Sequence, residues 1–321
     1  MNLPNIRFYN DYPASSDIRQ EVLDGMSDDP KRIPPKYFYD ARGSTLFEKI
    51  CGLPEYYATR TEINILKTHA REIAEFIGPN CLLIELGSGN STKVRLLLDA
   101  LQPATYMPID LSKEHLLENA KELAMDYPWL DVRPACMDFT QTLHIPFDSN
   151  AVKKVVFFPG SSIGNFEPRE ATEILGTIAN VLQSEGELLI GVDLKKDPGI
   201  LNAAYNDTKG VTAAFNKNVF VRINRELGAD FRVENFDHKA FYNEDKGRIE
   251  MHLVSKTDQV VNIDGVRSDI KKGERIHTEN SYKYRIDEFL RIAQKAGLEH
   301  KKTWTDNDDL FSVHYFRSLQ S

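Results

Sequence analysis

The sequence contains few cysteines and no apolar run long enough to span a membrane. Its three cysteines, Cys51, Cys81 and Cys136, are widely spaced and form no CxxC pair, which argues against a disulfide framework and predicts reduced thiols. The longest apolar stretches, such as residues 155–158, are far shorter than the roughly 20 residues that cross a bilayer. The N-terminal segment also lacks the apolar core of a signal peptide. We therefore expect a cytoplasmic protein with no membrane partner.

The sequence also lacks the marks of several function classes. No run of lysine and arginine stands out against the net charge of -8, so nucleic-acid partners are disfavoured. The eight histidines are scattered, and none pairs with a nearby histidine or cysteine at the spacing of metal ligands, so no metal is expected. No serine lies in a Gly-x-Ser-x-Gly motif, so a hydrolase would lack its usual nucleophile.

From Asn80 onward, short apolar runs alternate with amphipathic stretches, which predicts alternating strands and helices around a parallel sheet. The expected strands are residues 81–86, 105–109, 130–136, 154–158 and 187–192, and the expected helices are residues 92–101, 113–125 and 168–182. A last helix over 286–296 precedes two strands, 298–305 and 310–316, which are close enough to form an antiparallel hairpin. A parallel sheet that ends in such a hairpin is more typical of methyltransferases than of dinucleotide dehydrogenases.

The chain of 321 residues is long enough for one large domain and a second, smaller lobe. Between Asp193 and Lys283 the pattern changes to the alternation of antiparallel strands, with turn signals such as residues 245–247. We therefore predict an α/β fold in which a doubly wound, Rossmann-like sheet ends in an antiparallel hairpin. The smaller lobe would be of the α+β class.

A glycine-rich turn follows the first strand of the predicted sheet. Gly87, Ser88 and Gly89 lie between that strand and a helix that begins near Thr92. Glycine lets the backbone turn sharply and approach a ligand closely. The amide groups that open the helix favour a carboxylate or a phosphate, and Lys93 is a candidate cation for the same anion.

Two acidic residues end the next two predicted strands. Asp110 is placed to accept hydrogen bonds from both hydroxyls of a ribose. Asp138 could accept from an adenine amino group while Phe139 flanks the ring. Together with the glycine turn, these residues predict an adenosine-containing ligand. A dinucleotide fingerprint would have a third glycine in place of Thr92, so S-adenosylmethionine, which has no phosphate, is favoured over a nicotinamide cofactor.

Several longer strings of the sequence are specific enough to indicate a family. They are PPKYFYD at 34–40, LPEYYATRTE at 53–62, ELGSG at 85–89, PGSSIGNF at 159–166, YND at 205–207, GVTAAFN at 210–216, RIEM at 248–251 and ENSYK at 279–283. With them the chain, over nearly its whole length, resembles the histidine-specific Nα-methyltransferases that form hercynine, the trimethyl betaine of histidine, as the first step of ergothioneine synthesis.

The resemblance implies an S-adenosylmethionine-dependent enzyme with a small-molecule substrate, L-histidine. On this reading, the chain divides into an S-adenosylmethionine-binding methyltransferase domain over residues 61–195 and 284–321 and a substrate-binding lobe over residues 1–60 and 196–283. We expect the enzyme to be a monomer.

By this resemblance, Asn165 and Tyr205 would hold the α-carboxylate of the substrate, and Gly160 and Thr212 would line the same pocket. Methyl transfer from a sulfonium is an in-line displacement that needs a neutral amine lone pair placed near the methyl carbon. Firm binding of the carboxylate supplies that placement. Asn165 also follows the fourth predicted strand, at the end of the sheet where ligands of such folds bind.

Tyr39 and Phe47 would lie near the substrate amine, and Tyr39 and Asn165 are the candidate catalytic residues. Successive methylations convert the amine into a fixed cation, so the pocket must accept growing bulk and then a quaternary ammonium. Aromatic faces meet both needs, at about 0.5 to 2 kcal/mol for each cation–π contact.

Glu279, Ser281 and Tyr56 would contact the imidazole of the substrate, with Met251 beside it. A carboxylate at Glu279 favours a ring that carries an N–H group. Indole also has one N–H but no second nitrogen for Ser281 or Tyr56. Histidine is therefore the preferred acceptor, and tryptophan or another aromatic amino acid is the alternative. A nicotinamide-dependent oxidoreductase and a non-catalytic nucleotide-binding regulator are distant alternatives.

Overall fold

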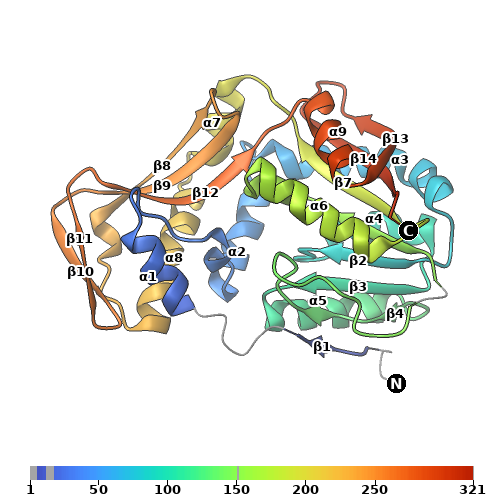
Figure 1. Ribbon diagram of the computed structural model, residues 1–321, viewed down its shortest axis with the longest axis horizontal. Helices are drawn as coiled ribbons and strands as arrows, with labels where there is room; N and C mark the ends of the chain where they lie inside the picture. The colour runs from blue at the N-terminus through green and yellow to red at the C-terminus, as the bar shows by residue number, and fades with distance from the viewer. Residues whose placement is uncertain (1–5, 12–17, 150–151, 321) are drawn as a thin grey trace. The chain divides into compact units, whose positions relative to one another are not determined.

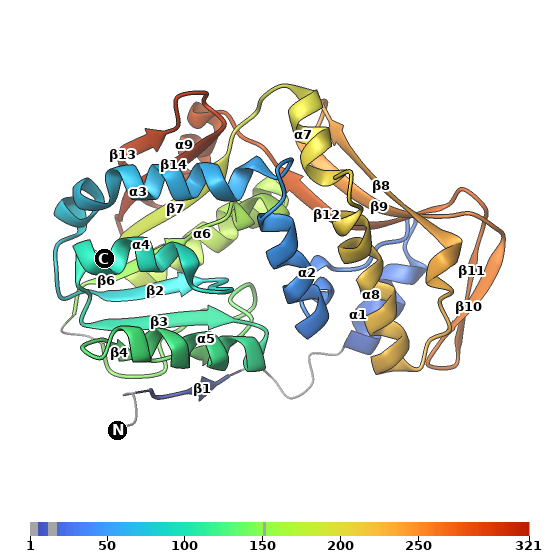
Figure 2. The same ribbon diagram turned by 180° about the vertical axis from the view of Figure 1, so that it is seen from behind.

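The computed structural model describes residues 6–11, 18–149 and 152–320, and Figures 1 and 2 show it from opposite sides. These residues divide into two compact units. The described residues of the first unit are 6–11, 58–149, 152–195 and 283–320, and those of the second unit are 18–57 and 196–282. Within the described part of the chain, no helix is both long and apolar enough to cross a membrane.

The first unit is built on a sheet whose described strands follow the order β1-β5-β3-β2-β6-β7-β14-β13, with β4 paired to β3. The strands are β1 (Tyr9–Asn10), β2 (Leu82–Leu86), β3 (Thr105–Asp110), β4 (Asp131–Val132), β5 (Ala135–Cys136), β6 (Lys154–Phe158), β7 (Glu187–Asp193), β13 (Leu298–Thr305) and β14 (Phe311–Ser318). Strands β1 to β7 pair in parallel, whereas β14 is antiparallel to both β7 and β13. The predicted doubly wound sheet with a final antiparallel hairpin is confirmed.

Helices cover both faces of this sheet. They are α3 (Tyr57–Ile77), α4 (Thr92–Leu101), α5 (Lys113–Asp126), α6 (Pro168–Leu182) and α9 (Ile286–Lys295). Figure 1 shows α6 and α9 in front of the sheet, and Figure 2 shows α3 and α4 on the opposite side. Helix α6 shows how sequence dictates this arrangement, because Ala171, Ile174, Leu175 and Ile178 are buried at helical spacing. The Glu170 carboxylate accepts from the Glu167 N–H at 2.9 Å and caps the helix start.

The described residues of the second unit form helices and two small antiparallel sheets. Its helices are α1 (Ile18–Ser27), α2 (Ala41–Cys51), α7 (Pro198–Tyr205) and α8 (Val211–Leu227). The sheets are β12-β9-β8, made by β8 (Phe236–Asn243), β9 (Arg248–Ser255) and β12 (Arg275–Tyr282), and the pair of β10 (Gln259–Ile263) and β11 (Val266–Ile270). Phe220 packs on Phe231 and Phe236, with ring centroids 4.1 and 4.6 Å apart. An aromatic core thus joins α8 to the larger of these sheets.

Two details differ from the sequence-based expectation. The N-terminal residues were expected in the second lobe, whereas Tyr9 and Asn10 of β1 pair with β5 in the sheet of the first unit. The single strand expected over 130–136 is divided into β4 and β5. Pro134 lies between them, and proline has no N–H to donate to a strand ladder.

Candidate active site

The glycine-rich turn lies at the carboxyl end of β2, where the strand order reverses between β2 and β6. Gly87 and Gly89 have φ angles of 67° and 51°, which residues with a Cβ rarely adopt. A Cβ added at either position would meet none of the described atoms within 4 Å, so the backbone is open to a ligand. The N–H groups of Gly87 and Ser88 donate to the Ile109 carbonyl at 2.9 and 3.1 Å, which ties the turn to β3.

Asp110, at the end of β3, is bonded directly to this turn. Its Oδ2 accepts from the Gly89 N–H at 3.1 Å, and its Oδ1 accepts from the Ser112 N–H at 3.0 Å. Each carboxylate oxygen has two lone pairs, so both retain capacity for a ligand hydroxyl. The structure therefore brings together the predicted glycine and the predicted acid of the cofactor site.

Asp138 and Phe139 follow β5, the strand that pairs with β3 so that Cys136 lies opposite Asp110. The Asp138 Oδ1 accepts from the N–H and the hydroxyl of Thr140 at 3.1 and 2.5 Å, which fixes its orientation. The Phe139 ring lies edge-on to Phe158, with centroids 5.5 Å apart. The second predicted acid and its aromatic neighbour thus follow a strand end adjacent to that of Asp110.

Lys93 has a partner that the sequence reasoning missed. Its Nζ lies 2.6 Å from the carboxylate of Glu62, whose side chain is 1% exposed. Both oxygens of Glu62 also accept from the Gly160 N–H at 3.0 Å. The sequence held one signal for Glu62. Ile65 and Leu66, one turn further along α3, are apolar and buried, so Glu62 lies on the apolar stripe of the helix. A glutamate on the apolar stripe of a helix is unusual unless it is paired.

Glu85 lies in β2 directly before the turn and is also buried. Burial raises the pKa of its carboxyl to about 8, although the Tyr106 hydroxyl donates to it and Lys93 attracts it, both of which lower the pKa. At neutral pH this carboxyl is therefore largely protonated. The charges near the turn are consequently those of Glu62, Lys93 and Asp110.

The loop after β6 carries Gly160 and Asn165. Gly160 has a φ of 82°, and Asn165 ends the short 3₁₀ helix η2 (Ser162–Asn165) and is half-buried. The Ser161 hydroxyl accepts from the Asp193 N–H at 2.9 Å, which holds the loop against the end of β7. Asp193 is itself paired with Lys283 at 2.7 Å in a buried position. These two predicted substrate residues thus share the first unit with the whole predicted cofactor site.

The other predicted substrate residues belong to the second unit, where four aromatic rings lie in series. The ring centroids are 5.7 Å apart for Tyr39 and Phe47, 6.4 Å for Phe47 and Tyr56, and 6.1 Å for Tyr56 and Tyr205. Each pair packs edge to face. The Tyr205 hydroxyl then donates to the Ser281 Oγ at 2.8 Å. These contacts bring together residues that are far apart in sequence.

Glu279 and Ser281 are two residues apart in β12, so their side chains share one face of the sheet. Met251 is the direct neighbour of Glu279 on β9. A β-bulge directly before Glu279 sets this register. The Thr278 Oγ1 at the bulge lies 2.7 Å from the Asn216 Oδ1 and 3.1 Å from the Met251 carbonyl oxygen, and both are acceptors. Three of the four residues predicted to surround the imidazole therefore form one patch.

Thr212 lies in the first turn of α8 and is buried. The Asp207 carboxylate accepts from the N–H groups of Val211 and Thr212 at 2.9 and 2.8 Å. Burial alone would raise the pKa of Asp207, but these hydrogen bonds outweigh it and lower the pKa. A charged carboxylate thus stabilises the start of the helix that carries Thr212.

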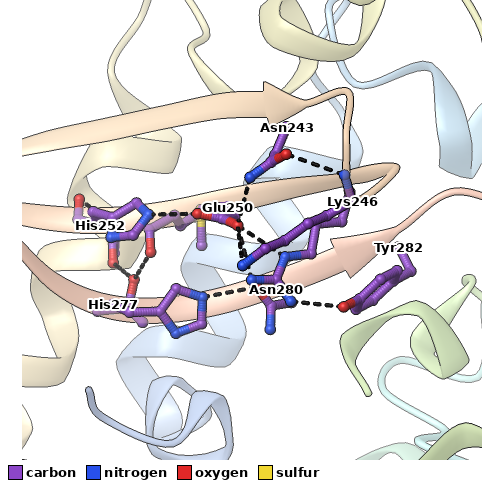
Figure 3. A network of polar contacts seen from close by, with 11 residues as sticks. Asn243, Lys246, Glu250, His252, His277, Asn280 and Tyr282 are labelled. Atoms are coloured by element: carbon purple, nitrogen blue, oxygen red, sulfur yellow. Dashed lines mark hydrogen bonds and ion pairs between the residues drawn. The ribbon is translucent and has the colours of Figure 1, made fainter. Parts of the chain in front are cut away.

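The opposite face of the same sheet carries a polar network, which Figure 3 shows. Glu250 accepts from the Arg248 Nε at 2.9 Å, and the Arg248 Nη1 donates to the Tyr282 hydroxyl at 2.6 Å. Burial alone would raise the pKa of Glu250, but the bonds and charge of Arg248 lower it. Burial, together with the charge of the neighbouring His277, lowers the pKa of His252 to about 4. This face is therefore fixed by charge pairs and differs from the aromatic face.

Among the described residues, no group of histidine, cysteine, aspartate and glutamate is arranged to hold a metal ion.

Residues 18–318 match the model of a family described as S-adenosylmethionine-dependent, histidine-specific methyltransferases. The chain is 42% identical over 299 residues to a histidine Nα-methyltransferase of Mycolicibacterium smegmatis, covering 91% of this chain and 92% of that protein. It is 39% identical to the protein of the same name from Mycobacterium tuberculosis, covering 92% and 93% of the two chains. It is 36% identical to ergothioneine biosynthesis protein 1 of Neurospora crassa, covering 89% of this chain and 33% of that protein.

Proposed function

This chain belongs to the family of S-adenosylmethionine-dependent, histidine-specific methyltransferases, and from that membership we propose that it methylates the α-amino nitrogen of L-histidine in successive steps. The product would be Nα,Nα,Nα-trimethylhistidine, or hercynine, formed as the first step of ergothioneine synthesis. The observation that carries the proposal is the 42% identity, over 91% of the chain, to an enzyme named for methylation of histidine at this nitrogen.

S-adenosylmethionine is the cofactor, and when bound it supplies the electrophilic methyl group. The residues of the first unit fit it. The Ser88 hydroxyl is buried in the glycine turn and has no hydrogen-bond partner among the described residues. The open backbone at Gly87 and Gly89 leaves room for a ligand, and Asp110 would accept from its ribose hydroxyls. Asp138 and Phe139 would hold the adenine, and Lys93 the carboxylate of the methionine part.

The substrate amine must be neutral and correctly placed when it accepts the methyl group. In the first unit, Asn165 would donate to the α-carboxylate of the amino acid, with Gly160 beside it. In the second unit, Tyr205 and Thr212 are assigned to the same group by resemblance. Tyr39 and Phe47 would face the amine, where their rings stabilise the cation that grows with each methylation.

The patch of Glu279, Ser281 and Met251 would select the acceptor ring. Glu279 would accept from an imidazole N–H, and a buried polar group of this kind disfavours rings that leave it without a partner. The bond from Tyr205 fixes the Ser281 oxygen, and Tyr56 packs on the same Tyr205. On this proposal, the first unit would bind the cofactor, and the second unit would recognise the side chain of the substrate.

The test is an incubation of the protein with S-adenosylmethionine and the twenty amino acids, followed by mass spectrometry. We expect mass increases of one, two and three methyl groups on histidine and at most a trace of methylation on tryptophan. Methylated tryptophan without methylated histidine would establish the alternative acceptor. The expectations of a monomer in the cytoplasm, with neither nucleic acid nor membrane as partner, stay predictions.

A further inference from the structure

Glu62 contacts two segments of the first unit. The proposed function assigns one of them to the cofactor and the other to the amino-acid substrate. Its carboxylate contacts the Lys93 Nζ, in the first turn of the helix after β2, and the Gly160 N–H, in the loop after β6. Strands β2 and β6 are neighbours at the point where the strand order reverses. In open α/β sheets, ligands bind at this point. Glu62 therefore bridges the start of α4 and the loop after β6, which border the expected binding crevice.

The sheet is built to admit this carboxylate. A Cβ added at Gly191 in β7 would lie 2.0 Å from the Glu62 Oε1 and 3.0 Å from the ring of Phe311. Any other residue at Gly191 would therefore displace the glutamate. A Cβ at Gly160 would lie 3.2 Å from the Lys93 Nζ. Gly191 thus leaves the space for the carboxylate, and Gly160 lets the lysine ammonium approach closely.

Stability alone is a weak reason for such a pair. Moving two charges out of water costs about as much as their attraction returns, so a buried ion pair is seldom more stabilising than apolar side chains of the same volume. The Glu62 side chain is 1% exposed and that of Lys93 is 19% exposed. The carboxylate is thus enclosed while the ammonium keeps an open side. That open side is available to an anionic group of a ligand.

We propose that Glu62 is a positioning residue for methyl transfer, which holds the Lys93 ammonium for the cofactor and the Gly160 amide for the loop that binds the substrate carboxylate. The inference rests on the proposed function, because that function gives Lys93 and Gly160 their roles. In this role Glu62 itself would touch neither reactant. Its effect on the cofactor passes through Lys93, and its effect on the amino acid passes through Gly160 and the loop that ends at Asn165.

Two substitutions separate these effects. In Glu62→Gln, the amide oxygen can still accept from the Gly160 N–H, but the charge that holds Lys93 is lost. We expect the Kd of S-adenosylhomocysteine to rise roughly tenfold or more, with a smaller change in the KM of histidine. In Glu62→Ala, both contacts are lost, so both the Kd and the KM should rise. A purely structural role would not divide the two parameters in this way.

A double variant tests the route through Lys93. If Glu62 acts on the cofactor by holding Lys93, then Glu62→Gln combined with Lys93→Met should bind S-adenosylhomocysteine no more weakly than Lys93→Met alone. Glu72→Gln is the matched control, because Glu72 lies on the same helix and also pairs with a lysine, Lys302, at 2.9 Å. It should leave the Kd and the KM within about twofold of wild type.

Thermal unfolding identifies the variants that fold. If Glu62→Ala does not fold, the comparison of Glu62→Gln with the double variant decides the question. Folded variants with an unchanged Kd and KM would overturn the inference, as would a double variant whose Kd rises by the product of the single effects. A wild-type protein that binds S-adenosylhomocysteine but leaves histidine unmodified would refute the proposed function instead, and the titrations would still test the link between Glu62 and Lys93.

Discussion

The candidate site residues of the two units differ in their chemistry and in the elements that carry them. In the first unit, the cofactor residues follow the ends of parallel strands, and backbone groups of Gly87 and Gly89 form the turn itself. Charges are concentrated there, at Glu62, Lys93 and Asp110. In the second unit, the candidate residues lie on one face of an antiparallel sheet and along a series of aromatic rings. The last of these rings, Tyr205, donates a hydrogen bond from its hydroxyl to Ser281.

This difference matches what the two proposed ligands require. A nucleoside presents hydroxyl and amino groups in a fixed arrangement, which carboxylates at neighbouring strand ends can match. An amine that becomes a quaternary cation needs apolar faces that tolerate growth. In the second unit, Arg248 and Glu250 pair on the face of the sheet opposite to Glu279, so the proposed recognition patch takes its carboxylate from Glu279. Substitutions in the two units should therefore affect different measurements.

The largest effect is expected at Asp110 in the first unit. Asp110→Ala would remove the proposed acceptor for two ribose hydroxyls, and each such hydrogen bond to a charged group is worth about 1.5 to 3 kcal/mol. It also releases the Gly89 N–H of the turn. We expect the affinity for S-adenosylhomocysteine to fall at least roughly a hundredfold in calorimetric titration. Asp126→Ala is the control, because Asp126 is exposed and pairs with Arg95; equal affinity in both folded variants would remove Asp110 from the site.

Asn165 tests the comparison within the first unit. It lies in the same unit as the proposed cofactor residues, but it is assigned to the carboxylate of the amino acid. Asn165→Ala should lower the kcat/KM for histidine roughly ten- to a hundredfold, since a hydrogen bond to a carboxylate is lost. The affinity for S-adenosylhomocysteine should stay close to that of wild type. Turnover near the wild-type rate would mean that the carboxylate is held by other groups.

The specificity of the second unit is tested at Glu279. Glu279→Ala should lower the ratio of kcat/KM for histidine over tryptophan roughly ten- to a hundredfold, because only a ring held by its N–H groups feels the missing carboxylate. The ratio cancels any general loss of folding or cofactor binding. Asn280→Ala is the control. Asn280 lies opposite Glu250 in the strand pairing and is hydrogen-bonded to His277 at 2.8 Å, on the face of the sheet opposite to Glu279. An unchanged ratio in Glu279→Ala would leave family membership intact but remove the main physical support for histidine specificity.

The last comparison concerns the pH dependence of stability and Glu85 in the first unit. The pKa of this carboxyl is raised from 4.5 to about 8 in the folded state. Between these two pH values the folded state therefore binds more protons than the unfolded state. Stability should therefore fall as the pH rises through this window. Glu85→Gln, which can still accept from Tyr106, should show a flatter profile of unfolding free energy between about pH 5 and 8. Glu75→Gln, at an exposed position of α3, should keep the wild-type slope.

Much of the first unit could be predicted from the sequence, because its pattern is local. The periods of the strands and helices gave the bounds of α4 and α6 as the structure has them. The cofactor residues could be proposed because each follows a strand directly, so that short strings such as 85–89 carry the signal. The division at Pro134 and the pairing of β1 were missed, since both depend on which strand edge a short segment meets.

The sequence by itself determined the fold class, the family and the short motifs at the strand ends, since alternation of apolar residues and the placement of glycine act over a few neighbouring positions. Only the tertiary structure decided which distant groups meet. Glu62 lies 98 positions before Gly160, and Tyr205 lies 76 positions before Ser281. No local pattern encodes such pairs, because the hydrogen bond and the ion pair form only after the sheet order and the bulge before Glu279 have fixed the positions of the side chains.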